Sequence, residues 1–128
     1  MAITNRAYSG FSVADVDATK RFYGDVLGLD LSENSMGFIN LQLASGATVL
    51  LYSKEDHVPA EYTVLNFEVD DIDSTVDELA ERGVAMMRYP GMPQDERGIM
   101  RGLAANRGPD IAWFTDPSGN VLSVLKSE

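Results

Sequence analysis

The chain's 128 residues, 45% of them hydrophobic, are enough for one domain with its own core. The net charge of −10 argues against a nucleic-acid partner, and the lack of cysteine excludes disulfides, thiolate metal ligands and a cysteine nucleophile. Because no apolar run approaches the roughly 20 residues of a membrane span, and residues 1–10 lack an apolar signal segment, we expect a cytoplasmic protein with no membrane partner.

The first half of the chain begins with a strand that leads into a helix. The segment FSVADVDATKRFYGDVLGL starts at Phe11, and its Asp15 suits a helix N-cap. Val16, Phe22 and Val26 recur at helical spacing, and a glycine at position 28 ends the pattern. A short strand over residues 29–34 and a two-strand hairpin around the turn at residues 45–46 should follow.

The second half repeats this order. The segment FEVDDIDSTVDELAERGV starts at Phe67 and places Ile72, Val76 and Leu79 at helical spacing before Gly83. A short strand over residues 84–89 and a hairpin around residues 118–119 complete the copy. The sequence therefore predicts an α+β fold of two βαβββ modules, residues 1–54 and 62–128, joined by a polar linker at residues 55–61. The modules should pack as a single domain, because neither covers both faces of its own sheet.

The connection over residues 89–110 is long and rich in glycine and proline. It carries Arg97, Arg101 and Arg107 together with Met92 and Met100. Such a loop is either a lid or binding segment, whose arginines could hold an anionic ligand, or a flexible connection.

Strand alternation sorts the side chains onto two faces. The helix-covered face should collect Phe11, Val13, Ile39, Leu41, Val49, Leu51, Leu65, Phe67, Val69, Phe114, Leu122 and Val124. The opposite, concave face should collect Ser12 and the residues that we predict to bind a ligand: Tyr8, Phe38, Asn40, Gln42, Leu50, Tyr52, Val64, Asn66, Glu68, Trp113 and Ser123. Aromatic and amide groups on one concave surface favour a small-molecule site. The alternative is that this face meets a dimer partner or the other module.

The motifs VADVDATKRFYGDVLGL, FEVDDIDSTVDELAERGV and WFTDPSGNVLSVL resemble the vicinal oxygen chelate superfamily, which includes glyoxalase I, extradiol dioxygenases and bleomycin resistance proteins. The resemblance runs from residue 8 to residue 125 and implies the paired-module fold. It also implies four metal-ligand positions, which Tyr8, Leu50, Val64 and Ser123 occupy here. None of the four is an imidazole or a carboxylate, so we expect no metal and no cofactor.

Other residue patterns do not assign a catalytic residue. His57 is the only histidine and is expected to be solvated in the linker. Ser123 lacks a nucleophile-elbow sequence and should only line the face. Glu68 could act as a base, pair with a cationic ligand, or lie at a solvated strand edge.

Two functions follow from these expectations. The first is a metal-free protein of the bleomycin resistance type that sequesters a neutral or cationic, partly aromatic small molecule. The alternative is a glyoxalase-like lyase, isomerase or dioxygenase with a rearranged site. A homodimer is expected in either case, because a half-covered sheet would otherwise leave Phe38, Leu50 and Trp113 exposed.

Overall fold

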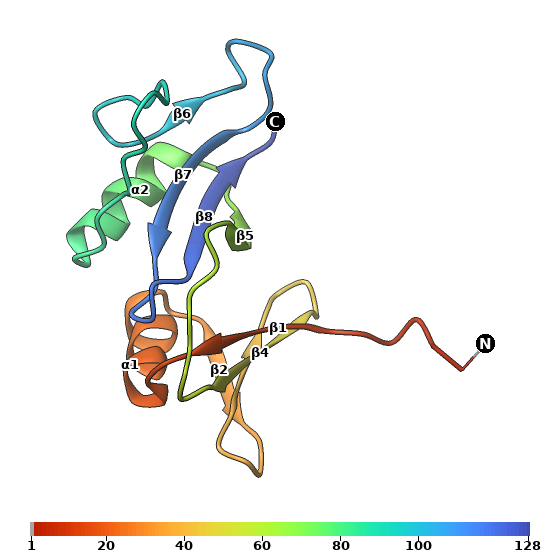
Figure 1. The fold of residues 1–128 in the computed structure, drawn as a ribbon. Coiled ribbons are helices and arrows are strands. Elements are labelled where there is room, and N and C mark those ends of the chain that lie inside the picture. Colours follow the sequence, from red (N-terminus) through yellow and green to blue (C-terminus); the bar gives the residue numbers. More distant parts are fainter. Residues whose placement is uncertain (1) are drawn as a thin grey trace. The chain divides into compact units, whose positions relative to one another are not determined.

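The computed structural model describes residues 2–128, which form two units: unit 1 ends at Pro59 and unit 2 spans Ala60–Glu128. Each unit contains one four-stranded sheet and one helical segment. Figure 1 shows the ribbon, coloured along the sequence. The predicted α+β fold of two βαβββ modules is confirmed. Within the described residues, no helix has both the length and the apolar character needed to cross a membrane.

Unit 1 has the strand order β1-β4-β3-β2, with β1 parallel to β4 and the other pairs antiparallel. Its elements are β1 (Ser9–Val13), α1 (Val16–Lys20), the π-helical turn η1 (Arg21–Val26), β2 (Asp30–Glu33), β3 (Ile39–Gln42) and β4 (Thr48–Ser53).

The helical segment of unit 1 begins at the predicted cap. The Asp15 side chain accepts a hydrogen bond from the Ala18 amide at 3.0 Å, which satisfies one of the first free N–H groups of the helix. From Arg21 onward the segment widens into a π-helix, in which the Leu27 amide donates to the Phe22 carbonyl at 2.9 Å. The predicted helix is therefore present, with a widened second half.

Unit 2 has the equivalent order β5-β8-β7-β6, with β5 parallel to β8. Its elements are β5 (Thr63–Glu68), α2 (Ile72–Glu81), β6 (Met100–Arg101), β7 (Asp110–Thr115) and β8 (Val121–Lys126). Helix α2 is capped by Asp71, whose side chain accepts from the Ser74 amide at 3.1 Å. The α2 side chains of Ile72, Val76 and Leu79 are buried, as their spacing predicts.

The strand predicted over residues 84–89 is not formed, and the short β6 pairs with β7 instead. The reason lies in the side-chain amide of Gln94, which accepts from the Tyr89 amide at 2.8 Å and donates to the Met87 carbonyl at 2.9 Å. These backbone groups are therefore satisfied by a side chain rather than by a neighbouring strand. One backbone hydrogen bond to β7 is still formed, from the Met87 amide to the Trp113 carbonyl at 2.7 Å.

The buried side chains agree with the predicted helix-covered face in the central strands. Ile39, Leu41 and Leu51 are fully buried in unit 1, as are Phe114 and Leu122 in unit 2. On the edge strands β1 and β5, burial of the predicted set is less complete, since Phe11, Leu65 and Phe67 are only half-buried. An edge strand has a neighbour on one side only, which explains the difference.

Candidate functional site

The sheet of unit 1 presents one row of residues across its four strands on the face opposite the buried core. The register aligns Gly10 of β1, Leu50 of β4, Asn40 of β3 and Ser32 of β2. Residues that pair directly across strands point to the same side of a sheet. A Cβ atom at position 10 would lie 3.0 Å from the Leu50 carbonyl oxygen, so the close approach of β1 to β4 favours glycine there. The row therefore has no side chain beside Leu50 on its β1 side.

One end of this face is aromatic. Tyr52 pairs with Ser12 across β4 and β1, and its ring lies 6.2 Å from that of Phe38 at an interplanar angle of 61°. The Ser12 hydroxyl in turn lies 2.6 Å from Nδ1 of His57.

His57 was expected to be solvated in the linker, and this expectation is wrong. The side chain is half-buried and hydrogen-bonded to Ser12 of β1. The alternation of β1 placed Ser12 on this face, but no sequence pattern indicates that the turn after β4 returns to it. His57 is therefore a residue of the candidate site that sequence reasoning missed.

The other end of the same face is polar. The Gln42 amide donates to the Ser32 hydroxyl at 3.1 Å, and the Thr48 hydroxyl donates to the Gln42 carbonyl oxygen at 3.3 Å. Gln42, a predicted ligand-binding residue, is exposed. Along the strands of unit 1, this face is thus aromatic at the end that contains Tyr52 and polar at the end that contains Gln42.

Unit 2 carries the equivalent row, formed by Asn66 of β5, Ser123 of β8 and Trp113 of β7. Ser123 corresponds to Leu50, as the internal repeat predicts. Its side chain is 0% exposed, and its hydroxyl donates to the Asn66 side-chain oxygen at 2.6 Å. Trp113 is half-buried and meets the ring of Tyr89 edge-on, with centroids 5.4 Å apart. Ser123 therefore orients Asn66, and its lining of a ligand-binding face stays a prediction.

The remaining predicted residues lie at the margins of the two sheets. Tyr8 precedes β1 and is 70% exposed. Val64 lies at an irregularity of β5, where the register with β8 shifts between Thr63 and Leu65. Glu68 is exposed at the end of β5 and borders an open hollow of about 360 Å³ that includes Lys126. This position favours the solvated strand edge among the alternatives for Glu68.

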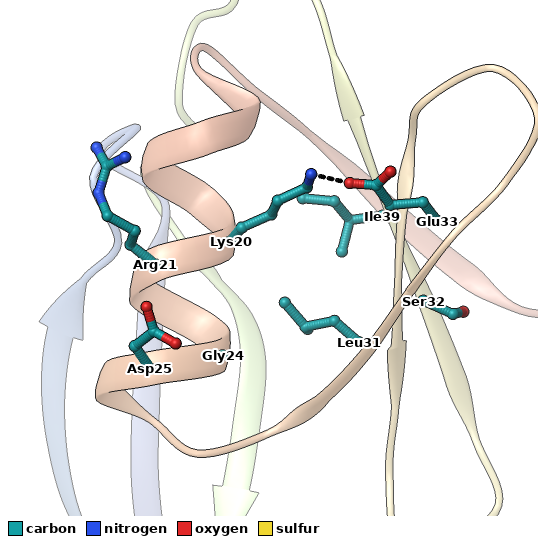
Figure 2. A pocket seen from close by; sticks show the side chains of 8 residues that line it. All are labelled: Lys20, Arg21, Gly24, Asp25, Leu31, Ser32, Glu33 and Ile39. Carbon is teal, nitrogen blue, oxygen red and sulfur yellow. Dashed lines mark ion pairs between the residues drawn. The ribbon is translucent and has the colours of Figure 1, made fainter.

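A second hollow, of about 330 Å³, lies between the helical segment of unit 1 and β2 (Figure 2). Leu31 and Ile39 line it, and Lys20 pairs with Glu33 across it. Gly24 faces β2 here, where a Cβ atom would lie 3.1 Å from the end of the Leu31 side chain. None of the predicted ligand-binding residues lines this hollow.

Two of the loop arginines are engaged by carboxylates. Arg101 binds Asp73 of α2 at 2.6 Å and Asp95 of the loop at 3.0 Å, and Arg97 binds Asp77 of α2 at 2.9 Å. The hydrogen bond from Arg101 lowers the pKa of Asp73. Burial opposes ionisation of Asp95, but bonds from the Ile99 amide and Arg101 outweigh it and lower the pKa of that carboxyl. The arginines therefore fasten the loop to α2, which disfavours their predicted role in binding an anion.

The four positions that correspond to the metal ligands of the family do not fit a transition metal. Leu50 and Val64 offer only hydrocarbon, Ser123 donates its hydroxyl to Asn66, and Tyr8 offers a phenol. Over residues 2–128, no three histidine or carboxylate side chains are grouped so that they could hold a metal ion.

Comparison with known proteins agrees with this architecture. Residues 7–124 match the model of the Glyoxalase/Bleomycin resistance protein/Dioxygenase superfamily. An uncharacterised protein of Bacillus subtilis (strain 168) is 29% identical, with 89% of this chain and 91% of the relative covered.

Two solved structures illustrate the similarity. An antibiotic-binding protein from Streptomyces sp. CB03234 is 25% identical, with a TM-score of 0.65 and coverage of 100% of this chain and 99% of that chain. An integron cassette protein from Vibrio cholerae is 24% identical, with a TM-score of 0.66 and coverage of 100% and 98%, and supports the fold alone. From the match over residues 7–124 and the paired βαβββ units, this chain belongs to the glyoxalase/bleomycin resistance protein/dioxygenase superfamily.

Proposed function

We propose that this chain is a small-molecule-binding protein that sequesters a neutral or cationic, partly aromatic ligand without a metal. The main support for this proposal comes from two equivalent positions, one in the sheet of each unit. Leu50 and Ser123 occupy these positions, where a metal enzyme of the family would have metal ligands. A hydrocarbon and a buried hydroxyl cannot hold a divalent cation, but they can form the wall of a binding surface.

The neighbouring groups support this ligand class. On the unit 1 face, Phe38 and Tyr52 offer aromatic surface, while Asn40 and Gln42 offer amides that can orient polar groups. On the unit 2 row, Trp113 offers aromatic surface. The net charge of −10 attracts cations and repels anions at long range. The 25% identical Streptomyces protein binds an antibiotic, which is the same general kind of function.

The proposal is tested by titration with bleomycin, a cationic molecule with a flat bithiazole, and with the anionic glutathione hemithioacetal of methylglyoxal. Trp113 is the only tryptophan and belongs to the unit 2 row, so a ligand stacked on that row should change its fluorescence with saturation. Calorimetry must accompany the titration, because Trp113→Phe removes the optical signal whether or not binding survives.

A pair of variants separates the predicted surface from other aromatic groups. Tyr52→Ala removes an aromatic group of the unit 1 face and should weaken binding about tenfold, as loss of one stacking contact does. Tyr62→Ala removes an aromatic side chain that is 72% exposed and outside the predicted set, and it should bind like the unaltered protein. Equal affinities for all three proteins would contradict the assignment of the unit 1 face to ligand binding.

The second candidate is a glyoxalase-like lyase, isomerase or dioxygenase, which the family membership favours. It is tested by assaying turnover of the hemithioacetal with added zinc, nickel, iron or manganese, together with elemental analysis of the purified protein. Metal-dependent turnover without a response to bleomycin would replace the binding-protein proposal with this one.

A further inference from the structure

The hollow between the helical segment of unit 1 and β2 combines an apolar floor with charged groups of both signs (Figure 2). We infer that this hollow is a second small-molecule site, which binds the zwitterion of an apolar amino acid. The ligand's carboxylate pairs with Lys20, its ammonium pairs with Glu33, and its side chain contacts the floor. The inference goes beyond the proposed function and does not depend on it, because none of the predicted ligand-binding residues lines the hollow.

The floor of the hollow is hydrocarbon on the helix-covered side of the sheet. Leu31 of β2 pairs with Leu41 of β3, and Glu33 pairs with Ile39. Residues that pair directly point to the same side of a sheet, and Leu41 and Ile39 are fully buried, so Leu31 and Glu33 also lie on the helix side. At about 330 Å³, the hollow is at the small end of the range for ligand sites, which suits a ligand of the size of one amino acid.

The helical segment leaves the floor open at Gly24. This residue lies within the π-helical turn η1, a rare geometry that is frequent at functional sites. A Cβ atom on Gly24 would lie 3.1 Å from the end of the Leu31 side chain. The absence of a side chain at position 24 therefore keeps open the space between the helical segment and β2.

The charged groups around the hollow are balanced in sign. Lys20 pairs with Glu33 across it, and the two side chains are 40% and 47% exposed. Arg21 and Asp25 also line the hollow and are exposed, and neither forms an ion pair within residues 2–128. Two positive and two negative groups complement a ligand that carries one charge of each sign.

A zwitterion exchanges one ion pair for two. When the Lys20–Glu33 pair opens, the ligand's carboxylate pairs with Lys20 and its ammonium pairs with Glu33, so neither side chain loses a partner. A ligand with a single charge leaves one of these two side chains unpaired. Because both are partly exposed, each pair contributes modestly, and the loss of one should weaken affinity by about threefold.

Unit 2 has a longer connection between its helix and its edge strand. The connection spans residues 27–29 in unit 1 and residues 82–99 in unit 2. Ile99 is fully buried and lies in sequence between Arg97 and Arg101, which both bind carboxylates of α2. The longer connection thus brings an apolar side chain and ion pairs to the helix of unit 2. An apolar amino acid would bring the same combination to unit 1.

The test uses L-phenylalanine and three analogues, followed by NMR at neutral pH. N-acetyl-L-phenylalanine lacks the ammonium, phenethylamine lacks the carboxylate, and glycine lacks the apolar side chain. Methyl shifts of Leu31 and Ile39 report binding in the hollow, whereas side-chain amide shifts of Asn40 and Gln42 report binding on the opposite face. We expect L-phenylalanine to bind in the millimolar range, and each analogue to bind about threefold more weakly or worse.

Two variants should change which charge the hollow prefers. Glu33→Gln releases Lys20, so it should weaken the binding of L-phenylalanine about threefold and strengthen that of N-acetyl-L-phenylalanine. Lys20→Gln releases Glu33, so it should weaken L-phenylalanine and strengthen phenethylamine. Lys54→Gln is the matched control, because it breaks another exposed ion pair of unit 1, with Asp56, and should leave every affinity unchanged.

A third variant tests the space itself. Gly24→Met fills the hollow and should abolish the ligand-induced shifts of Leu31 and Ile39. Methionine is a better helix former than glycine, so the variant should fold, and Gly24→Ala is the smaller substitution if it does not.

The outcomes decide the inference without deciding the proposed function. If L-phenylalanine at tens of millimolar shifts neither methyl group, or shifts only Asn40 and Gln42, the hollow is not its site and the inference is wrong. If the single-charge analogues bind as tightly as L-phenylalanine, or if Glu33→Gln and Lys20→Gln weaken all probes alike, the preference for a zwitterion is wrong. Opposite changes in the two variants, with Lys54→Gln unchanged, support the inference.

Discussion

At the scale of single residues, Ser123 shows how a polar side chain on a central strand of the sheet is satisfied within its own unit. Its hydroxyl is fully buried and donates to Asn66 at 2.6 Å. Burying a hydroxyl without a hydrogen-bond partner destabilises the folded state. The bond to Asn66 therefore stabilises the fold mainly by avoiding this desolvation cost. Asn66 is exposed, and its oxygen can turn to water when Ser123 is truncated. The loss on truncation should therefore be moderate.

Ser123→Ala is expected to lower the free energy of unfolding by about 1 kcal/mol. Chemical denaturation measures it, with Ser127→Ala, which is exposed at the end of the chain, as the matched control. A double-mutant cycle with Asn66→Ala isolates the pair. A coupling energy of zero in that cycle would show that the two side chains act independently.

The residues of the candidate site differ in how well sequence could find them. Leu50 and Ser123 were found to be equivalent, because two copies of one strand pattern align around a Ser-Gly turn. The contact of His57 with Ser12 could not be found, because it depends on the path of the turn after β4. The regular spacing of apolar residues in a sequence predicts which side chains share one face of a strand or helix. The contacts that a turn makes depend on its backbone torsion angles, which this spacing does not predict.

At the scale of elements, the connection over residues 89–110 is joined to α2 by charged groups. Arg101 binds Asp73 of the helix and Asp95 of the loop, and Ile99 within the loop is fully buried. Arg101→Met keeps much of the aliphatic stem but removes the charge. We expect the amide of Ile99 to exchange with solvent several-fold faster in this variant, while the helix content stays the same. Arg107→Met, on an exposed part of the same loop, should exchange like the unaltered protein.

The same network sets the pH dependence of the loop. The pKa values of Asp73 and Asp95 are lowered in the folded state, so their contribution to stability is present above the ordinary value of 3.8 and is lost as the pH falls through the lower folded values. The raised pKa of Arg101 keeps that group charged throughout. Protection of Ile99 should therefore fall below about pH 3.8 in the unaltered protein. A pH response of the same size in Arg101→Met would contradict this origin.

The missing strand over residues 84–89 shows where element prediction fails. The repeat predicts a strand there, and the Met87 amide does bond to β7. The Gln94 side chain, however, takes the backbone groups of Met87 and Tyr89 that a ladder would need. A side chain that replaces a strand has no periodic signature, so this difference between the two units could not be predicted.

At the scale of the whole molecule, the internal repeat was sufficient to predict the fold. The capping aspartates, Asp15 and Asp71, and the two Ser-Gly turns occur in the same order in each half, and both sheets have the same strand order. Function is less determined at this scale, because these shared residues form caps, turns and core in binding proteins and enzymes alike.

Formation of a homodimer is a property of the whole chain. Several large apolar side chains are more than two-thirds exposed, among them Ile3, Tyr8 and Val58. Tyr8 also precedes β1, an edge strand of the unit 1 sheet, where a symmetric partner could cover both. We therefore expect a homodimer whose interface includes the start of β1.

Light scattering at micromolar concentration should give twice the monomer mass of 14.0 kDa. Tyr8→Lys places a charge beside the edge strand and should raise the dissociation constant about tenfold or more, since burying an unpaired charge is costly. Met36→Lys is the matched control: Met36 is 72% exposed and equally apolar, but it lies in the turn before β3, away from β1. A stable monomer would mean that each chain covers its own apolar surface. A dimer weakened equally by both variants would place the interface elsewhere.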